Sequence, residues 1–317
     1  MHVSIVIPNY NGLEVLKKHL PAVLKCMRKD DELIVVDDAS KDDSAVFLKS
    51  TYPQVKVIEH TLNKRFGQTC NDGIAEAKNE LVLLLNNDVA PDPELLKHLL
   101  PHFDDPKIAA VGCCEHNSAG VLSGKSIASF TRGMFIHDRA TKQTSGYTMW
   151  STAGSMMVRK AIWEQLGGMD HAFRPAYFED IDLGYRMWKA GFLVRFEAKA
   201  KVFHDHETTN ITAFGNEHIQ VMSYKNGFIF MWKNVTDFSV FLQHICWLPY
   251  HLIIGGIRSH GLLILGFFQA ILQMGEVFIS RAKITKMTVL RDAQVIKKVQ
   301  TLDEEFGEEK HDKNMAT

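Results

Sequence analysis

The sequence lacks the cysteine patterns of small secreted domains and of zinc modules. Its five cysteines form no Cys-x-x-Cys pair and no ladder of regular spacings, which argues against a disulfide framework. Acidic and basic residues nearly balance, 37 against 36, so no global charge attracts nucleic acid. The first residues have neither the basic start nor the small-residue cleavage site of a signal peptide. We therefore expect a cytoplasmic protein with no nucleic-acid partner.

Common phosphate-binding motifs are also missing. No G-x-x-x-x-G-K-[ST] loop is present, and no G-x-G-x-x-G follows the first apolar segment, so kinases, ATPases and Rossmann dehydrogenases lose their main support. A sugar-nucleotide pyrophosphorylase normally has a glycine-rich, basic loop after its first strand. Here that place reads "PNYNG" (8–12). A phosphorylated ligand must therefore be bound by another kind of loop.

The first half of the chain alternates short aliphatic runs with amphipathic segments. The runs are continuous rather than alternating, which is typical of strands buried on both faces. This order predicts βαβ units and a mostly parallel α/β sheet flanked by helices. The expected strands are 3–7, 32–37, 55–58, 81–86 and 108–112, and the expected helices are near 13–28, 42–51, 66–78 and 93–104.

Three of these strands end in polar clusters, at 8–11, 37–40 and 86–88. Ligands of parallel sheets collect at the carboxyl ends of the strands. Asp37, Asp38 and Asp88 would lie there side by side and repel one another unless a cation or ligand joined them. Mg²⁺ is usually coordinated by one or two carboxylates together with the phosphates of a substrate. The clusters thus predict a site for a metal and a phosphorylated ligand.

Four ordered segments resemble glycosyltransferase family 2, and in particular its rhamnosyltransferase-like branch of bacterial polysaccharide assembly. They read "VSIVIPNYNG", "LIVVDDASKDDS", "NKRFGQTCNDGIAEAKNELVLLLNND" and "YFEDIDLGYRMWKAGF", and the resemblance covers roughly residues 3 to 210. It implies a GT-A fold and an inverting, metal-dependent enzyme. Such an enzyme transfers a sugar from a UDP- or dTDP-sugar to a hydroxyl of a glycan acceptor, here expected to be lipid-linked.

The resemblance also implies a nucleotide pocket. Pro8 and Tyr10 would line it from the loop after the first strand, and Asp38 would accept a hydrogen bond from the base while Asp37 supports the loop. Arg65 matches a basic residue near the nucleotide. Asn87 belongs to the same set, and two weaker candidates are Asn71 and Asp72.

The metal is expected at Asp88, which matches the last aspartate of the family's DxD-like signature. That signature reads Asn86-Asn87-Asp88 here and leaves one carboxylate rather than two. His204 matches a histidine next to the metal, with His206 as the fallback. The cofactor implied is Mg²⁺ or Mn²⁺.

The acid cluster of "YFEDIDLGYRMWKAGF" is expected to perform the chemistry. The family's base matches Asp180, which would take the proton of the acceptor hydroxyl, and Glu179 would bind or orient the acceptor. For Asp182 a structural role is favoured, because it can pair with Arg186 one helical turn away.

The remaining segments suggest how the chain is divided. Residues 115–150 are rich in Gly, Ser and Thr, which predicts long loops and short strands that choose the acceptor, with 150–155 nearby. We expect a catalytic domain over 1–212, with a nucleotide half (1–112) and an acceptor half (113–212). A helical region over 213–302 and a charged flexible tail over 303–317 would follow.

The helical region is strongly apolar from 238 to 279, but Pro249, Arg258-Ser259-His260 and Gln269 interrupt it, which disfavours a single membrane span. Packing on the catalytic core and an oligomer interface are two alternatives. The basic residues of 281–298 favour a third, an in-plane or hairpin attachment to the inner face of the cell membrane. The rival to an enzyme is a catalytically inactive nucleotide-sugar-binding scaffold.

Overall fold

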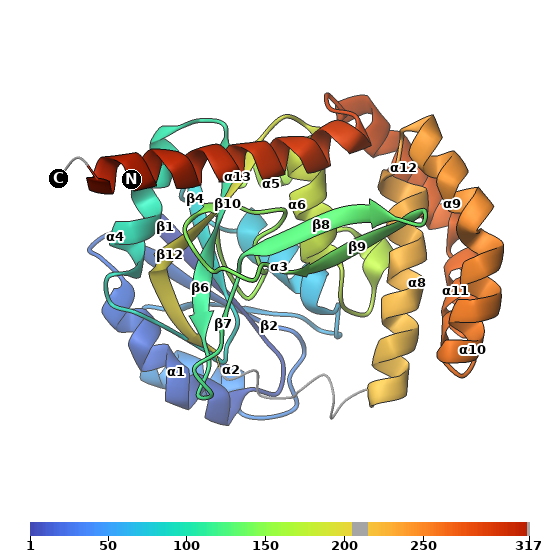
Figure 1. The fold of residues 1–317 in the computed structure, drawn as a ribbon. Helices are drawn as coiled ribbons and strands as arrows, with labels where there is room; N and C mark the ends of the chain where they lie inside the picture. The colour runs from blue at the N-terminus through green and yellow to red at the C-terminus, as the bar shows by residue number, and fades with distance from the viewer. Residues whose placement is uncertain (205–214, 316–317) are drawn as a thin grey trace.

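The computed structural model describes residues 1–204 and 215–315, with side chains to residue 308. Its centre is a ten-stranded sheet in the order β10-β12-β6-β11-β4-β1-β2-β3, with β5 added to β12 and β7 to β6 (Figure 1). The strands are β1 (Val3–Asn9), β2 (Glu32–Asp37), β3 (Lys56–Glu59), β4 (Leu81–Leu85), β5 (Val89–Pro91), β6 (Ile108–His116), β7 (Leu122–Ser123), β10 (Gly146–Tyr147), β11 (Ser155–Arg159) and β12 (Leu193–His204).

The N-terminal half is the parallel unit that the apolar runs predict. Strands β1 to β4 are parallel neighbours, and their crossovers contain α1 (Leu13–Cys26), α2 (Ser44–Thr51) and α3 (Phe66–Ala75). Every residue of β1 and β4 is buried, as a strand covered on both faces requires. Gly73 lets α3 approach β1 closely, because a Cβ there would lie 2.5 Å from Cγ1 of Val6. The predicted α/β fold is confirmed.

The C-terminal half of the sheet is mixed. Strand β11 lies antiparallel between β4 and β6, and β12 runs parallel to β6. The expected helix at 93–104 consists of α4 (Leu95–Leu99) and a 3₁₀ turn (Leu100–Asp104) with Pro101 near its start. Two further helices, α5 (Lys160–Leu166) and α6 (Glu179–Lys189), cover this half.

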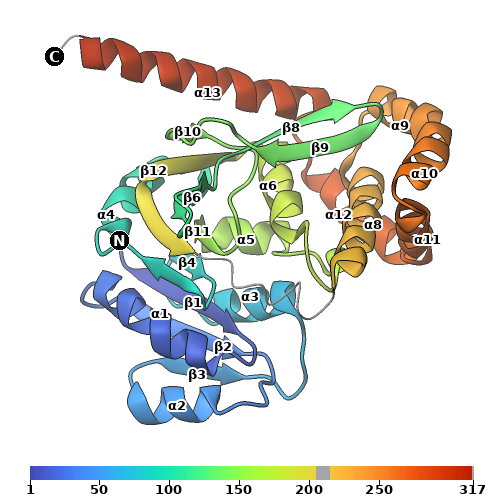
Figure 2. The same ribbon diagram turned by 60° about the horizontal axis from the view of Figure 1, so that its bottom comes forward.

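Residues 115–150 contain short strands, as their composition predicts. Apart from β7 and β10, they form a separate antiparallel hairpin of β8 (Ser126–Thr131) and β9 (Met134–Arg139). Its turn is Arg132-Gly133, both with positive φ. The hairpin projects from the sheet toward the C-terminal helices (Figure 2).

The C-terminal region is helical. It consists of α8 (Asn216–Asn234), α9 (Phe238–Tyr250), a π-helical turn (His251–Gly255), α10 (Gly256–Arg258), α11 (Leu262–Leu272), α12 (Met274–Met287) and α13 (Asp292–Met315). Pro249 was expected to interrupt the helix, but it does not. A 21-residue helix runs from Phe238 to Arg258, and the π turn that follows Pro249 is one way in which a helix absorbs a missing N–H.

The charged tail expected to be frayed is helical in the structure, since residues 303–315 continue α13. Asp303 accepts hydrogen bonds from Nζ of Lys125 (2.7 Å) and from the backbone N–H of Tyr147 (3.0 Å). The guanidinium carbon of Arg195 lies 4.3 Å from the ring centroid of Phe306. These contacts with β10, β12 and the start of β8 are long-range, so the acidic composition of the tail gave no sign of them.

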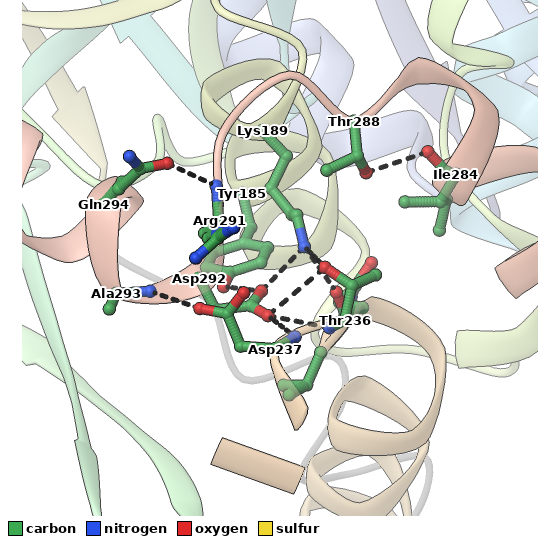
Figure 3. Close-up of polar contacts among 12 residues, drawn as sticks. Tyr185, Lys189, Thr236, Asp237, Ile284, Thr288, Arg291, Asp292, Ala293 and Gln294 are labelled. Atoms are coloured by element: carbon green, nitrogen blue, oxygen red, sulfur yellow. Dashed lines mark hydrogen bonds and ion pairs between the residues drawn. The ribbon is translucent and has the colours of Figure 1, made fainter. Parts of the chain in front are cut away.

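The buried carboxylate of Asp292 connects α13 to α6 and to the link between α8 and α9 (Figure 3). Asp292 is fully buried and accepts hydrogen bonds from the Tyr185 hydroxyl (2.6 Å), the Lys189 ammonium (2.8 Å) and the N–H groups of Thr236 and Asp237 (2.7 and 2.6 Å). Burial lowers the pKa of Lys189, and the charge of Asp292 opposes that shift. Asp292 therefore joins α13, α6 and the link between α8 and α9.

We expect Asp292→Ala to lower the free energy of unfolding by about 3–5 kcal/mol, because it leaves the Lys189 ammonium buried without its carboxylate. Urea denaturation measures the change. The control is Glu276→Ala, which breaks the half-exposed Arg174–Glu276 ion pair and is expected to cost less than about 1 kcal/mol. Equal losses in the two variants would contradict the structural role of Asp292.

Candidate active site

Asn9 joins the carboxyl ends of three parallel strands. Its amide donates a hydrogen bond to Asp37 at the end of β2 (3.0 Å), and its carbonyl oxygen Oδ1 accepts one from Asn87 just after β4 (2.8 Å). A Cβ on Gly12 would collide with both amides, so only glycine fits there. The structure therefore brings all three predicted polar clusters into direct contact, and it holds the Asn87 side chain.

Asp38 organises the loop that carries Arg65. Its carboxylate accepts hydrogen bonds from the backbone N–H groups of Lys64 (2.7 Å) and Arg65 (2.9 Å), and it lies 2.8 Å from Nδ1 of His60. A carboxylate has about four acceptor positions, so Asp38 retains capacity for a ligand although it is 4% exposed. Arg65 itself is exposed, and its backbone adopts a positive φ of 72°.

Two other nucleotide candidates differ in exposure. Tyr10 is 43% exposed at this edge of the sheet. Pro8 was expected in the loop after the first strand, but it lies in β1. That strand continues to Asn9 and pairs Pro8 with Val36 inside the sheet. Asn71, a weaker candidate, has a structural role, since its side chain bonds both backbone groups of Met169.

The expected metal residues lie together. His204, at the end of β12, places Nε2 3.2 Å from Oδ1 of Asp88, and its Nδ1 lies 3.6 Å from Oε1 of Glu115. Burial lowers the pKa of His204, but its contacts with Asp88 and Glu115 outweigh burial and raise it to about 9. The fallback candidate His206 lies outside the described residues.

The chemistry of this pair suits a divalent ion. Two ligand atoms bound at roughly 2.1 Å to one octahedral ion lie about 3 Å apart, close to the Asp88–His204 separation. Within residues 1–204 and 215–315, no three His, Cys, Asp or Glu side chains form a complete metal cage. An ion held here would take its remaining ligands from water or substrate.

Glu179 and Asp180 begin α6 directly after an unusual turn. Tyr177 and Phe178 both have positive φ values, 72° and 73°, which is costly for aromatic residues and is typical of functional sites. Asn226 of α8 supports the turn by donating hydrogen bonds to the carbonyls of Ala176 and Tyr177, each 2.9 Å. These hydrogen bonds hold the turn in the conformation that orients the backbone of Glu179 and Asp180 at the start of α6.

Burial raises the pKa of both carboxyl groups at the start of α6. Burial and then the charge of Asp180 raise the pKa of Glu179 to about 8. Burial raises the pKa of Asp180 as well, although its Oδ1 and Oδ2 accept hydrogen bonds from the N–H groups of Ile181 (2.8 Å) and Ala153 (3.3 Å). Glu179 therefore keeps its proton near neutral pH. Glu179 Oε2 is buried and has no hydrogen-bond partner within the described part of the chain.

A short backbone segment connects this acid pair to the metal residues. Ala153 bonds Asp180, and the next residue, Gly154, accepts a hydrogen bond from the N–H of Asn86 (2.9 Å). A Cβ on Gly154 would lie 2.8 Å from Nδ2 of Asn86, so the two segments touch. On the other side, Arg65 and Glu179 line one small pocket. These contacts connect the segments that carry Asp180, Asn86 and Arg65.

Asp182 has the structural role that its spacing favours. It is fully buried, and its carboxylate lies 2.7 Å from Arg186, as the i,i+4 pair predicts. Lys233 and Asn234 of α8 also donate to it, at 2.5 and 2.8 Å. The sequence did not indicate these partners, because α8 is 50 residues away.

Glu115 is the residue that the sequence analysis missed. It is 3% exposed in β6, near His204, and it accepts a hydrogen bond from Ser155 (2.7 Å). The one available signal was a carboxylate that ends a buried strand, "IAAVGCCE", as Asp37 does in β2.

The sheet, the ordered polar strand ends and the acid pair define the GT-A class of fold. The chain is similar to GalNAc-T7 solved with UDP, GalNAc and Mn²⁺ (TM-score 0.56, 16% identity, 83% of this chain and 58% of that one). It is also similar to the mannosyltransferase PcManGT of Pyrobaculum calidifontis in complex with GDP-Man and Mn²⁺ (TM-score 0.54, 13% identity, 90% and 85%).

Residues 4–167 match the model of glycosyl transferase family 2, and the chain belongs to this family. It is 27% identical to the O-antigen chain rhamnosyltransferase RfbN of Salmonella typhimurium, over 66% of this chain and 68% of that protein. It is also 27% identical to the pre-mycofactocin glycosyltransferase of Mycobacterium tuberculosis. That match covers 65% of this chain and only 43% of the relative's length.

The raised pKa of Glu179 predicts a pH-dependent effect of Glu179→Gln on stability. Between about pH 4.5 and 8 the unfolded chain releases this proton and the folded chain keeps it, so wild-type stability falls as pH rises. Glutamine removes the loss. We expect the melting temperature of Glu179→Gln to exceed that of wild type by a few degrees near pH 9, and the difference to vanish near pH 4. A difference independent of pH would contradict the assignment.

Proposed function

We propose that the chain is an inverting glycosyltransferase that moves a sugar from a nucleotide-diphosphate donor to a hydroxyl of a glycan acceptor. The observation that carries the proposal is the link from Asp180 through Ala153 and Gly154 to the Asn86-Asn87-Asp88 segment. This link supports the proposal because Asp180, the proposed base, is connected by it to the segment expected to hold the diphosphate end of the donor.

In this proposal Asp180 takes the proton of the acceptor hydroxyl as its oxygen bonds to the anomeric carbon. The bond from that carbon to the diphosphate breaks on the opposite side, which inverts the configuration and leaves the electron pair on the nucleoside diphosphate. Glu179, which keeps its proton near neutral pH, binds the acceptor as a hydrogen-bond donor.

Asp88 and His204 would hold a divalent ion, Mg²⁺ or Mn²⁺. The ion would stabilise the negative charge of the leaving diphosphate. Two similar structures were solved with Mn²⁺. His204 must lose its proton to bind a metal, and Glu115 would then orient the ring through Nδ1.

The donor proposed is a UDP- or dTDP-sugar. Asp38 would accept a hydrogen bond from the base, and Asn9 holds Asn87 in place for the donor. Tyr10 and Arg65 are exposed at the same edge of the sheet, where a ring and a guanidinium can contact the nucleotide. Pro8, buried in β1, would contribute only to the floor.

The acceptor proposed is a growing, lipid-linked bacterial glycan at the inner face of the cell membrane. The name of the similar Salmonella protein, an O-antigen chain rhamnosyltransferase, supports polysaccharide synthesis. A cavity next to the Arg65–Glu179 pocket also supports it, because this cavity extends along α12 to Ile279 and Lys283. An apolar chain with a charged head group suits such a lining.

A catalytically inactive scaffold that binds nucleotide sugars is the second candidate. It is favoured by the single carboxylate of the Asn86-Asn87-Asp88 segment. A thermal-shift screen of nucleotide sugars with and without Mn²⁺ would identify the donor, since a ligand of the native state raises the melting temperature. Donor hydrolysis or transfer with the selected sugar then separates enzyme from scaffold.

Asp180→Asn is expected to lower the rate of transfer by about 10²–10⁴-fold, because the amide cannot accept the proton. Donor binding, measured by thermal shift, should stay within about twofold of wild type. Normal turnover in this variant would show that Asp180 is not the base.

Asp88→Ala is expected to weaken Mn²⁺-dependent donor binding by at least about tenfold, because the ion loses its only carboxylate from the 86–88 segment. Titration calorimetry with and without Mn²⁺ measures the effect. The control is Asp92→Ala, which removes an exposed carboxylate four residues along the chain that bonds only the N–H of Glu94 in its own turn. Equal losses in both variants, or none at Asp88, would contradict the metal assignment.

A further inference from the structure

The C-terminal helices expose large apolar side chains that the proposed reaction does not use. Leu272, Phe238 and Ile257 are 85%, 78% and 71% exposed. We call the exposed apolar side chains of α9–α12 the apolar helical face, which consists of Phe238, Leu242, Ile245, Trp247, Ile253, Ile257, Ile264, Leu265, Phe268, Ile271, Leu272, Phe278 and Ile279. An accumulation of exposed apolar side chains on neighbouring helices marks a surface that binds a partner or a membrane.

Within residues 1–204 and 215–315, these helices pack against α8, the β8–β9 hairpin and the 3₁₀ turn at 171–173. Helix α8 lies between α11 and the sheet, and α9, α10 and α11 form the outermost layer (Figures 1 and 2). Gly266 brings α11 against α8, where a Cβ would lie 2.9 Å from the carbonyl oxygen of Val221. On the same helix Leu265, Phe268 and Leu272 are 51%, 58% and 85% exposed.

The charge around this face has one sign. From residue 238 to residue 291 the sequence contains five Lys or Arg and a single acid, Glu276. Arg281 is used internally, since it donates to the carbonyls of Trp232 and Val235. Lys283 and Lys286 at the end of α12 are exposed. Basic side chains beside exposed apolar helices are complementary to an anionic lipid surface.

An aromatic and cationic cluster lies at the junction of this face with the β8–β9 hairpin. The guanidinium of Arg132 lies 5.6 Å from the ring centroid of Trp247 and 5.2 Å from that of Tyr250, and it donates a hydrogen bond to the Tyr250 hydroxyl (2.8 Å). Side chains with an apolar body and a polar tip are typical of the boundary between hydrocarbon and water.

We propose that the apolar helical face docks in the plane of a bilayer that contains anionic lipid, without crossing it. The proposal deepens the membrane contact of the proposed function, and it rests on that function only in assigning the docked surface to a lipid-linked acceptor. The apolar helical face then contacts the acyl chains, and the basic residues beside it contact the lipid phosphates. The Arg132 cluster lies in the head-group region.

Length and composition alone would permit a span. The helix Phe238–Arg258 has 21 residues and a mean hydropathy of 1.4, and the bent pair α11–α12 passes the same test. However, the middle of Phe238–Arg258 is bonded to the hairpin turn. His244 lies 2.8 Å from the carbonyl of Gly133, and His251 lies 2.8 Å from that of Arg132.

Crossing would place this turn, with its charged arginine, in the hydrocarbon, where polar backbone and charge are costly. Helix α11 has 11 residues and is about 17 Å long, well short of the ~30 Å hydrocarbon core. The 69° bend between α11 and α12 prevents the pair from forming one straight span. These constraints favour an in-plane arrangement.

A second copy of the chain is a weaker fit for the same surface. A symmetric dimer would bring the basic ends of two α12 helices to one interface, with Glu276 the single acid of the segment to offset them. Anionic lipid instead supplies the missing negative charge. Dimerisation through this face is therefore an outcome that the experiment must be able to reveal.

Flotation of the full-length protein with vesicles tests the proposal. We expect binding to neutral phosphatidylcholine vesicles and tighter binding when phosphatidylglycerol is added. Phe268→Glu and Leu272→Glu should each weaken binding at least about tenfold. The matched control is Val46→Glu, at a 66% exposed apolar residue of α2, which should bind as wild type. Failure of wild type to float, or equal loss in the control, would overturn the proposal.

A second pair of variants separates charge from apolar contact. Lys283→Gln with Lys286→Gln should remove most of the gain from phosphatidylglycerol and leave binding to neutral vesicles unchanged. Thermal unfolding of each variant shows that it is folded. Unchanged binding to phosphatidylglycerol vesicles in this variant would overturn the role of the basic residues.

Cys246 on α9 reports depth, because it is exposed while the other four cysteines are buried. A fluorophore attached there should be quenched by nitroxides near the head groups and less by nitroxides deep in the acyl chains. The opposite order would indicate a span. A probe that ignores vesicles but changes with protein concentration, together with dimers in sedimentation, would indicate self-association, and either result overturns the proposal.

Activity separates this proposal from the proposed function. Donor hydrolysis without vesicles depends on the catalytic residues alone, so Leu272→Glu should hydrolyse donor at the wild-type rate while losing vesicle binding. An active protein that ignores vesicles would refute the docking face only. A protein that binds vesicles but never turns over donor would refute the enzyme only.

Discussion

The hydrogen bonds of Asn9 with Asp37 and Asn87 hold together the ends of three parallel strands. Parallel strands bring their carboxyl ends to one edge, but they do not by themselves fix the side chains there. Asn9 does so for β1, β2 and the segment after β4. Asp38 next to Asp37 then fixes the Arg65 loop, and Asn86 next to Asn87 meets Gly154. The residues proposed to bind the nucleotide and the metal and to act as the base thus take their relative positions from one small polar network.

Helix α6 connects that network to the C-terminal region. Its first residues are the acid pair, its middle is held by the buried Asp182–Lys233 ion pair with α8, and its end is held by Asp292 of α13. Asn226 of α8 supports the turn that precedes it. The C-terminal helices are therefore part of the scaffold of the candidate active site. A membrane docked on their outer face would lie at a fixed orientation to the acid pair.

Much of the N-terminal half could be predicted, because its strands are local apolar runs and its site residues end them. The pairing of Asp88 with His204 follows the family resemblance and joins residues more than 100 positions apart. Glu115 was missed because its one local signal, a carboxylate after an apolar run, does not reveal that His204 lies next to it in the fold. Pro249 was misread as an interruption, because a helix can continue through proline when a π turn follows. The tail was misread as frayed because Lys125, Tyr147 and Arg195 are far away in sequence.

The sequence by itself determined the parallel unit, the order of the polar clusters and the apolar character of residues 238–279, since these depend on periodicity and on the residues at strand ends. Only the tertiary structure decided which carboxyl keeps a proton, which residues approach His204 and which side of α9–α12 faces outward. Those properties depend on burial and on charges brought together by long-range packing. No local stretch of sequence contains either.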